Sequence, residues 1–159
     1  MKIIGNIKPA RPSFYKARTS SPVQLADTGI GDITSEPIDK QACAPLHKLL
    51  QASGYAVRIS KFNWDEPTLV AVQGSVAPHE DNKLGLIAFW LLYKQPLNKK
   101  RENVANQWLV DDPWLFTNQQ RRRVKVGDVV LFDADETHAW MCNGGIYAIS
   151  QTISRKRKP

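Results

Sequence analysis

The chain has 159 residues, of which 42% are hydrophobic and 23% are charged, and its formal net charge is +7. These proportions are those of ordinary globular domains, so they argue against wholesale disorder. The length suits a single domain that buries most of its apolar surface in one core.

The sequence does not predict a secretion signal or a membrane-spanning helix. The opening residues 1–6 do not have the long apolar core of a secretion signal. The longest apolar run, 84–93, is too short to cross a bilayer as a helix. We therefore expect a cytoplasmic protein that does not enter a membrane; the sequence leaves its oligomeric state open.

The first part of the chain, residues 1–34, is rich in Pro, Ser, Gly and Thr. Pro9, Pro12 and Pro22 interrupt any long regular element. We expect this part to form an extended N-terminal arm with room for one edge strand.

A helix is predicted over residues 36–53. Ser35 is a good N-cap and Pro37 suits the first turn. Apolar residues then recur at helical spacing up to a glycine that would end the helix: Ala44, Leu46, Leu49, Leu50 and Gly54. His47 lies on this helix and is predicted to be an ordinary surface residue.

After this helix the pattern changes to that of strands. Alternating, β-branched or continuously apolar segments occur between turn signals, at 55–60, 68–72, 84–93, 128–132 and 146–153. Several strands after one helix predict a mainly β fold, a β-barrel or jelly roll. The domain would span 35–153, followed by a basic tail, 154–159.

Cysteines and positive charge carry weaker signals. Cys43 and Cys142 lack the spacing of a zinc site or disulfide framework, which favours two free thiols; a nucleophilic Cys142 is the alternative.

Basic clusters at 99–101, 121–123 and 155–158 are typical of solvated loops and tails, and they also suit nucleic acid or another polyanion as a partner. The five tryptophans are expected in the core and its rim.

The most specific chemical signal is an H-x-D pair, His79 and Asp81, with a later histidine, His138. Residues two apart in a strand point to the same side, so His79 and Asp81 would face one cavity while Glu80 faces away. Two imidazoles and one carboxylate can hold Fe(II) on one face and leave the other face open. The alternative is that both histidines are ordinary polar residues near strand ends.

The segment 127–138, Gly-Asp-Val-Val-Leu-Phe-Asp-Ala-Asp-Glu-Thr-His, resembles the second motif of the cupins. Asp133 stands where Pro is usual and Asp135 where Gly is usual. Together with H-x-D, it is similar to the double-stranded β-helix superfamily, which contains the cupins and the Fe(II)- and 2-oxoglutarate-dependent oxygenases. The likeness covers about half the chain, roughly 70–153. H-x-D followed by a distant His is more similar to the oxygenases, because cupins commonly offer H-x-H and a Glu.

The resemblance implies metal ligands at His79, Asp81 and His138, and a basic residue that holds 2-oxoglutarate. Lys94 closes the apolar strand where the JmjC-like branch has its lysine, and Arg155 is the second candidate. A strand-end lysine that extends to solvent is the ordinary alternative for Lys94. A hydroxyl from Thr152 or Tyr93 could add a contact.

The implied activity is that of a dioxygenase, an oxidoreductase that couples decarboxylation of 2-oxoglutarate to hydroxylation or demethylation of an unidentified substrate. Two other functions stay open. One is a cupin-like metalloprotein without 2-oxoglutarate. The other is a noncatalytic barrel that binds nucleic acid or protein through its basic surface.

Overall fold

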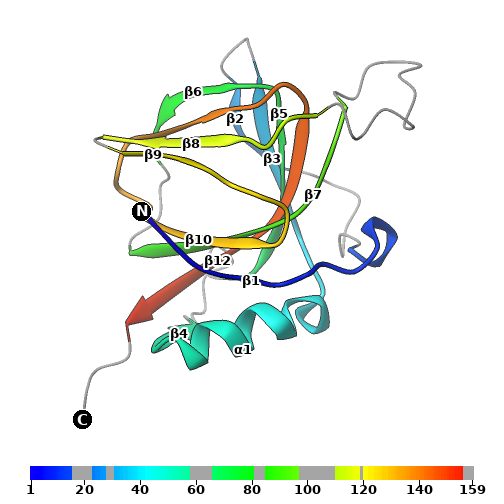
Figure 1. Ribbon diagram of the computed structural model, residues 1–159, viewed down its shortest axis with the longest axis vertical. Helices are drawn as coiled ribbons and strands as arrows, with labels where there is room; N and C mark the ends of the chain where they lie inside the picture. The colour runs from blue at the N-terminus through cyan, green and yellow to red at the C-terminus, as the bar shows by residue number, and fades with distance from the viewer. Residues whose placement is uncertain are drawn as a thin grey trace.

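The computed structural model describes residues 1–15, 23–27, 31–57, 66–80, 85–96, 110–118 and 120–155, with the side chains of 23–27 and Arg155 excepted. Figure 1 shows two antiparallel sheets packed on each other and one helix against the outer face of the larger sheet. The elements are β1 (Lys2–Asn6), β2 (Val23–Asp27), β3 (Asp32–Pro37), α1 (Ala44–Ala52), β4 (Tyr55–Val57), β5 (Thr68–Gln73), β6 (Val76–His79), β7 (Leu86–Gln95), β8 (Trp114–Thr117), β9 (Gln120–Arg123), β10 (Asp128–Asp133), β11 (His138–Met141) and β12 (Gly145–Arg155).

The strand order identifies the fold. The large sheet is eight-stranded and runs β1-β10-β7-β12-β5-β3-β2, with β4 paired to β12, and the small sheet runs β6-β11-β8-β9. From β5 to β12 the chain therefore winds between the two sheets, as it does in a jelly roll. The predicted mainly β, double-stranded β-helix architecture with one N-terminal helix is confirmed.

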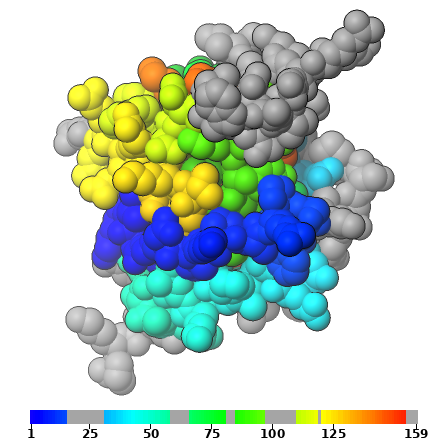
Figure 2. Space-filling view, turned by 45° about the vertical axis from the view of Figure 1, so that its right-hand side comes forward, coloured from blue at the N-terminus to red at the C-terminus, as the bar shows by residue number. Residues whose placement is uncertain are grey.

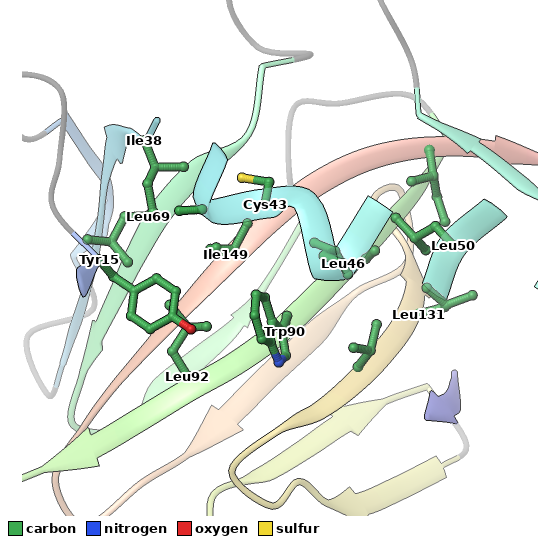
Figure 3. Packing of buried hydrophobic residues seen from close by; sticks show 14 of the residues in the cluster. Tyr15, Ile38, Cys43, Leu46, Leu50, Leu69, Trp90, Leu92, Leu131 and Ile149 are labelled. Carbon is green, nitrogen blue, oxygen red and sulfur yellow. The ribbon is translucent and has the colours of Figure 1, made fainter. Parts of the chain in front are cut away.

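The continuous apolar run of β7 is explained by burial on both faces. Its inward residues Phe89 and Leu91 belong to the core between the sheets. Its outward residues Trp90 and Leu92 belong to a second core, which α1 covers with Leu46 and other side chains (Figure 3). Such two-sided burial is typical of the central strand of a sheet.

The N-terminal arm contributes more to the fold than the one edge strand that its composition suggests. Residues 2–6 pair with β10, and residues 32–37 pair with β5 along their whole length. The segment 23–27 then pairs with β3 at the sheet edge. Pro9 and Pro12 lie between β1 and β2, so they do not interrupt the pairing.

The helix begins later than residue 36. Residues 36–37 are held in β3 by their pairing with β5, which the local sequence does not reveal. Asp39 then accepts a hydrogen bond from the backbone N–H of Gln41 at 3.3 Å and starts a 3-10 turn, Lys40–Cys43, which continues into α1. The helix ends at Ala52, one residue before the predicted end. No described helix is long and apolar enough to span a membrane.

The turn before β10 fixes the start of this strand, which belongs to the segment 127–138. Gly127 has a φ of +94°, a conformation that favours glycine. The Asp128 carboxylate accepts hydrogen bonds from the backbone N–H of Lys125 at 2.8 Å and from the amide of Asn6 at 2.9 Å. The turn at Gly127 and Asp128 thus connects the start of β10 to the end of β1.

Candidate metal centre

The site lies at one end of the barrel interior, where the small sheet presents a row of polar side chains. Across β8, β11 and β6, Thr117 pairs with His138 and His138 pairs with His79. Directly opposed residues in antiparallel strands share a face, so all three side chains point the same way. The imidazole centroids of His79 and His138 are 4.4 Å apart.

Backbone carbonyls orient both imidazoles. Nδ1 of His79 lies 2.9 Å from the carbonyl oxygen of Ala77, and Nδ1 of His138 lies 2.8 Å from that of Glu136. A carbonyl can only accept, so Nδ1 donates in each ring, and in the neutral imidazole the lone pair then falls on Nε2. Metal-binding histidines commonly have this arrangement, with the nonligating nitrogen bonded to a carbonyl or carboxylate. The chemistry of these two donors therefore fits a divalent metal.

The third predicted ligand, Asp81, lies outside the described residues. Within the described ranges, no group of three or more His, Cys, Asp or Glu side chains is placed to hold a metal ion. The structure thus brings together two of the three predicted ligands. Glu80 is exposed, as strand alternation predicts, and its carboxylate accepts a hydrogen bond from the Thr137 hydroxyl at 3.2 Å.

The turn between β10 and β11, which carries the chain from the large sheet to the small one, delivers His138 to the site. Ala134 N–H donates to the Gly85 carbonyl at 2.9 Å, and Glu136 N–H donates to the Asp133 carbonyl at 3.2 Å. Asp133 and Asp135 are exposed, so these acids occupy the turn without burying a charge. The departures from the usual cupin residues therefore do not displace His138, which begins β11 as predicted.

Apolar rings cover the inner side of His138. His138 is only 3% exposed, and its ring lies 4.8 Å from that of Phe132. Phe89 contacts both Phe132 and Trp140 behind it. These rings enclose His138 on the side of the core.

Two buried hydroxyls face this end of the barrel. The hydroxyls of Thr117 and Thr152 have no hydrogen-bond partner among the described residues, and Thr152 is 2% exposed. Thr152 pairs with Ile87, which pairs in turn with Phe132, so Thr152 belongs to the row that faces the histidines from the large sheet. The sequence raised Thr152 as a hydroxyl donor but gave no sign of Thr117, because the strand β8 was not recognised after Pro113.

Of the two predicted carboxylate-binding cations, only Lys94 has a described side chain, and it is engaged in an ion pair. Nζ of Lys94 is 3.0 Å from Oδ1 of Asp112, and Lys94 lines a cavity of about 520 Å³ whose walls include neither His79 nor His138. Arg155 ends β12 and pairs with Tyr55 through its backbone.

Tyr93 and the thiols do not join the site. The Tyr93 ring stacks on that of Tyr147 at 4.6 Å and 10°, and burial raises its pKa to about 12. Burial also raises the thiol pKa of both Cys43 and Cys142 to about 12, which opposes the thiolate that nucleophilic catalysis requires. His47, predicted at the surface, is instead partly buried and its Nε2 lies 3.0 Å from Oε1 of Gln151.

Three solved structures are similar to this chain at low sequence identity. No family model matches the chain, and no curated protein matches it. A predicted oxalate decarboxylase from Thermotoga maritima is 12% identical, with 89% of this chain and 97% of that chain covered and a TM-score of 0.46. A cupin-2 domain containing protein from Shewanella frigidimarina is 11% identical, with 91% and 87% covered and a TM-score of 0.38. A cupin superfamily protein from Desulfitobacterium hafniense is 14% identical, with 97% and 98% covered and a TM-score of 0.38.

Proposed function

We propose that the chain is an Fe(II)-dependent dioxygenase that binds its metal through His79, Asp81 and His138 and uses 2-oxoglutarate to hydroxylate or demethylate its substrate. One observation carries this proposal: the two imidazoles lie side by side with both Nδ1 atoms bonded to carbonyls. A carboxylate two residues after His79 would complete the set of ligands typical of such enzymes. The test is whether the Fe(II)-loaded protein converts 2-oxoglutarate to succinate, and whether His138→Ala abolishes the conversion.

The chain's own residues supply orientation and a dry environment. The carbonyls of Ala77 and Glu136 hold the imidazole planes and fix their tautomer. The Phe132 ring shields His138 from water. When bound, the metal and cosubstrate supply the oxidation of a substrate C–H bond by O₂.

The two buried hydroxyls support an oxygen-rich ligand in this end of the barrel. A buried hydroxyl without a partner is costly, and a carboxylate would accept a hydrogen bond from it. We infer that Thr152, with Thr117 opposite, contacts the carboxylate of the cosubstrate.

Replacing the Thr152 hydroxyl should therefore have opposite effects on stability and on binding. Thr152→Val should raise the free energy of unfolding of the metal-free protein by about 1 kcal/mol, because it removes an unsatisfied polar group. It should also weaken the 2-oxoglutarate-induced rise in Tm. Chemical denaturation measures the first effect, and Thr137→Val, which removes a hydroxyl bonded to Glu80, is the control without a stability gain. A loss of stability in Thr152→Val would show that its hydroxyl is already satisfied.

Lys94 is the proposed cation for the distal carboxylate of 2-oxoglutarate. Its cross-strand neighbour Ile146 belongs to the core between the sheets, so Lys94 shares the inward face. At about ten times its Kd, 2-oxoglutarate should raise the Tm of the metal-loaded protein by about 3–6 °C, and Lys94→Ala should remove the rise.

Asp112→Asn is the matched control for Lys94. It breaks the ion pair but leaves the cation in place. If Lys94 holds the cosubstrate, Asp112→Asn keeps or strengthens the rise in Tm. Equal loss in both variants would mean that the ion pair only supports the fold.

A cupin-like metalloprotein without 2-oxoglutarate is the second candidate. It is favoured by the engagement of Lys94 with Asp112 and by the absence of both histidines from the walls of the Lys94 cavity. In that case Fe(II) or Mn(II) still raises the Tm, while 2-oxoglutarate adds no further rise and no succinate forms.

A further inference from the structure

We propose that the outer surface of β8 and β9 binds single-stranded nucleic acid, with phosphates on two arginines and one base in the adjoining cavity. The residues of this surface, here called the arginine face, are Trp114, Phe116, Arg121 and Arg123. It is independent of the histidine pair, which points into the barrel.

The arginine face is built by cross-strand pairs. Trp114 pairs with Arg123 and Phe116 with Arg121, so these four side chains share one side of the hairpin. The guanidinium carbons of Arg121 and Arg123 lie 5.7 and 5.1 Å from the centroid of the Trp114 ring. Contact with the ring restricts both side chains while their N–H groups remain available for a phosphate, for which the planar guanidinium is well suited.

The positive charge of this surface is not neutralised within the described part of the chain. All residues of β9 are exposed, and no described carboxylate forms an ion pair with Arg121, Arg122 or Arg123. In the described sheet β9 pairs only with β8, so it forms an open edge. In Figure 2 the yellow atoms of this part of the chain lie at the upper left of the visible surface. Charge complementarity therefore indicates an anionic partner.

The cavity of about 520 Å³ that Lys94, Asp111 and Asp112 also line adjoins the arginines, and its apolar groups favour nucleic acid over an acidic peptide. Trp114 and Arg123 belong to both the cavity and the arginine face, and Met141, which is 56% exposed, lies opposite Trp114 across the strands. An indole and a thioether suit the flat face of a base, whereas an acidic side chain needs only the cations.

A charged edge strand also has a purely protective explanation, because arginines on an edge discourage pairing with other chains. That explanation requires neither the ordered contact with Trp114 nor a cavity beside it. It predicts no preference for nucleic acid over other polyanions, and this difference makes the proposal testable.

The test measures fluorescence anisotropy of a labelled oligothymidylate of about 12 nucleotides with the full chain, free of metal, over a range of salt concentrations. The double variant Arg121→Gln/Arg123→Gln should lose at least about tenfold in affinity, and the slope of log K against log salt should fall by about 1.4, the value for two phosphate contacts on a single strand. The matched control Lys40→Gln/Lys48→Gln removes two exposed charges near and on α1 and should lose less than about threefold.

Trp114→Leu separately tests whether a base stacks on the Trp114 ring. It should weaken binding by about fivefold or more with little change in the salt slope, because stacking is not an ionic contact. Equal losses in the two double variants, or no binding by the unmodified chain, would overturn the proposal. Displacement of the oligonucleotide by polyglutamate at equal charge concentration would also overturn it and would indicate an acidic protein instead. Because the assay contains no metal, its outcome is separable from that of the oxygenase proposal.

Discussion

Fe(II) or Mn(II), supplied at about 100 times its Kd, is expected to raise the Tm of the chain by about 5–10 °C. Binding at that ratio stabilises the folded state by about 2.7 kcal/mol, and 1 kcal/mol corresponds to about 2–4 °C for a chain of this size. His79→Ala and His138→Ala should each abolish the rise, because each removes one of two imidazoles whose centroids are 4.4 Å apart. Asp81→Ala should do the same. Thermal unfolding followed by circular dichroism is the measurement.

His47→Ala is the control for this first prediction. It removes the remaining histidine of the chain, which contacts Gln151 under α1. This variant should unfold at a lower temperature than the parent and still show the full metal-induced rise. A rise that persists in both His79→Ala and His138→Ala would place the metal elsewhere. A rise that persists only in Asp81→Ala would remove that carboxylate from the ligand set.

The second large effect is expected at Trp90, where Trp90→Ala should lower the free energy of unfolding by about 3–5 kcal/mol. Trp90 is 1% exposed and packs beneath α1 in the outer core. Its Nε1 donates to the carbonyl of Ile7 at 3.1 Å, and its ring meets Tyr15 edge-on at 6.0 Å. Truncation would therefore leave a cavity and also release the N-terminal segment from the sheet.

Urea denaturation measures the Trp90 effect, with Phe14→Ala as the control. Phe14 comes from the same segment but is 58% exposed, so its truncation should cost less than about 1 kcal/mol. Similar small losses in both variants would mean that the helix and N-terminal segment contribute little to the stability of the barrel.

The barrel could be predicted because its strands carry their own signals. The β10 strand follows a glycine turn, and β7 is apolar along its length because both of its faces are buried. The β1 and β3 strands carry no such signal, because their pairing with β10 and β5, which lie far away in the sequence, is what makes them strands. The β8–β9 hairpin was missed because three consecutive arginines are typical of a solvated loop, and only the pairing with Trp114 makes them a strand.

The histidine pair could be predicted from the motifs, since H-x-D and the Gly-Asp strand each place one histidine near a strand end. The surrounding polar groups could not. Thr117 faces His138 only through the register of β8 and β11, which the local sequence does not specify. The ion pair of Lys94 likewise depends on where the chain returns at Asp112. Contacts between sheets and between distant loops are set by tertiary packing.

The most direct test of the metal centre is anomalous diffraction at the iron or manganese edge from crystals grown with the metal. The account predicts one strong peak within bonding distance of Nε2 of His79, Nε2 of His138 and the Asp81 carboxylate. A peak bound by other side chains, or no peak in crystals that contain a well-ordered histidine pair, would contradict it.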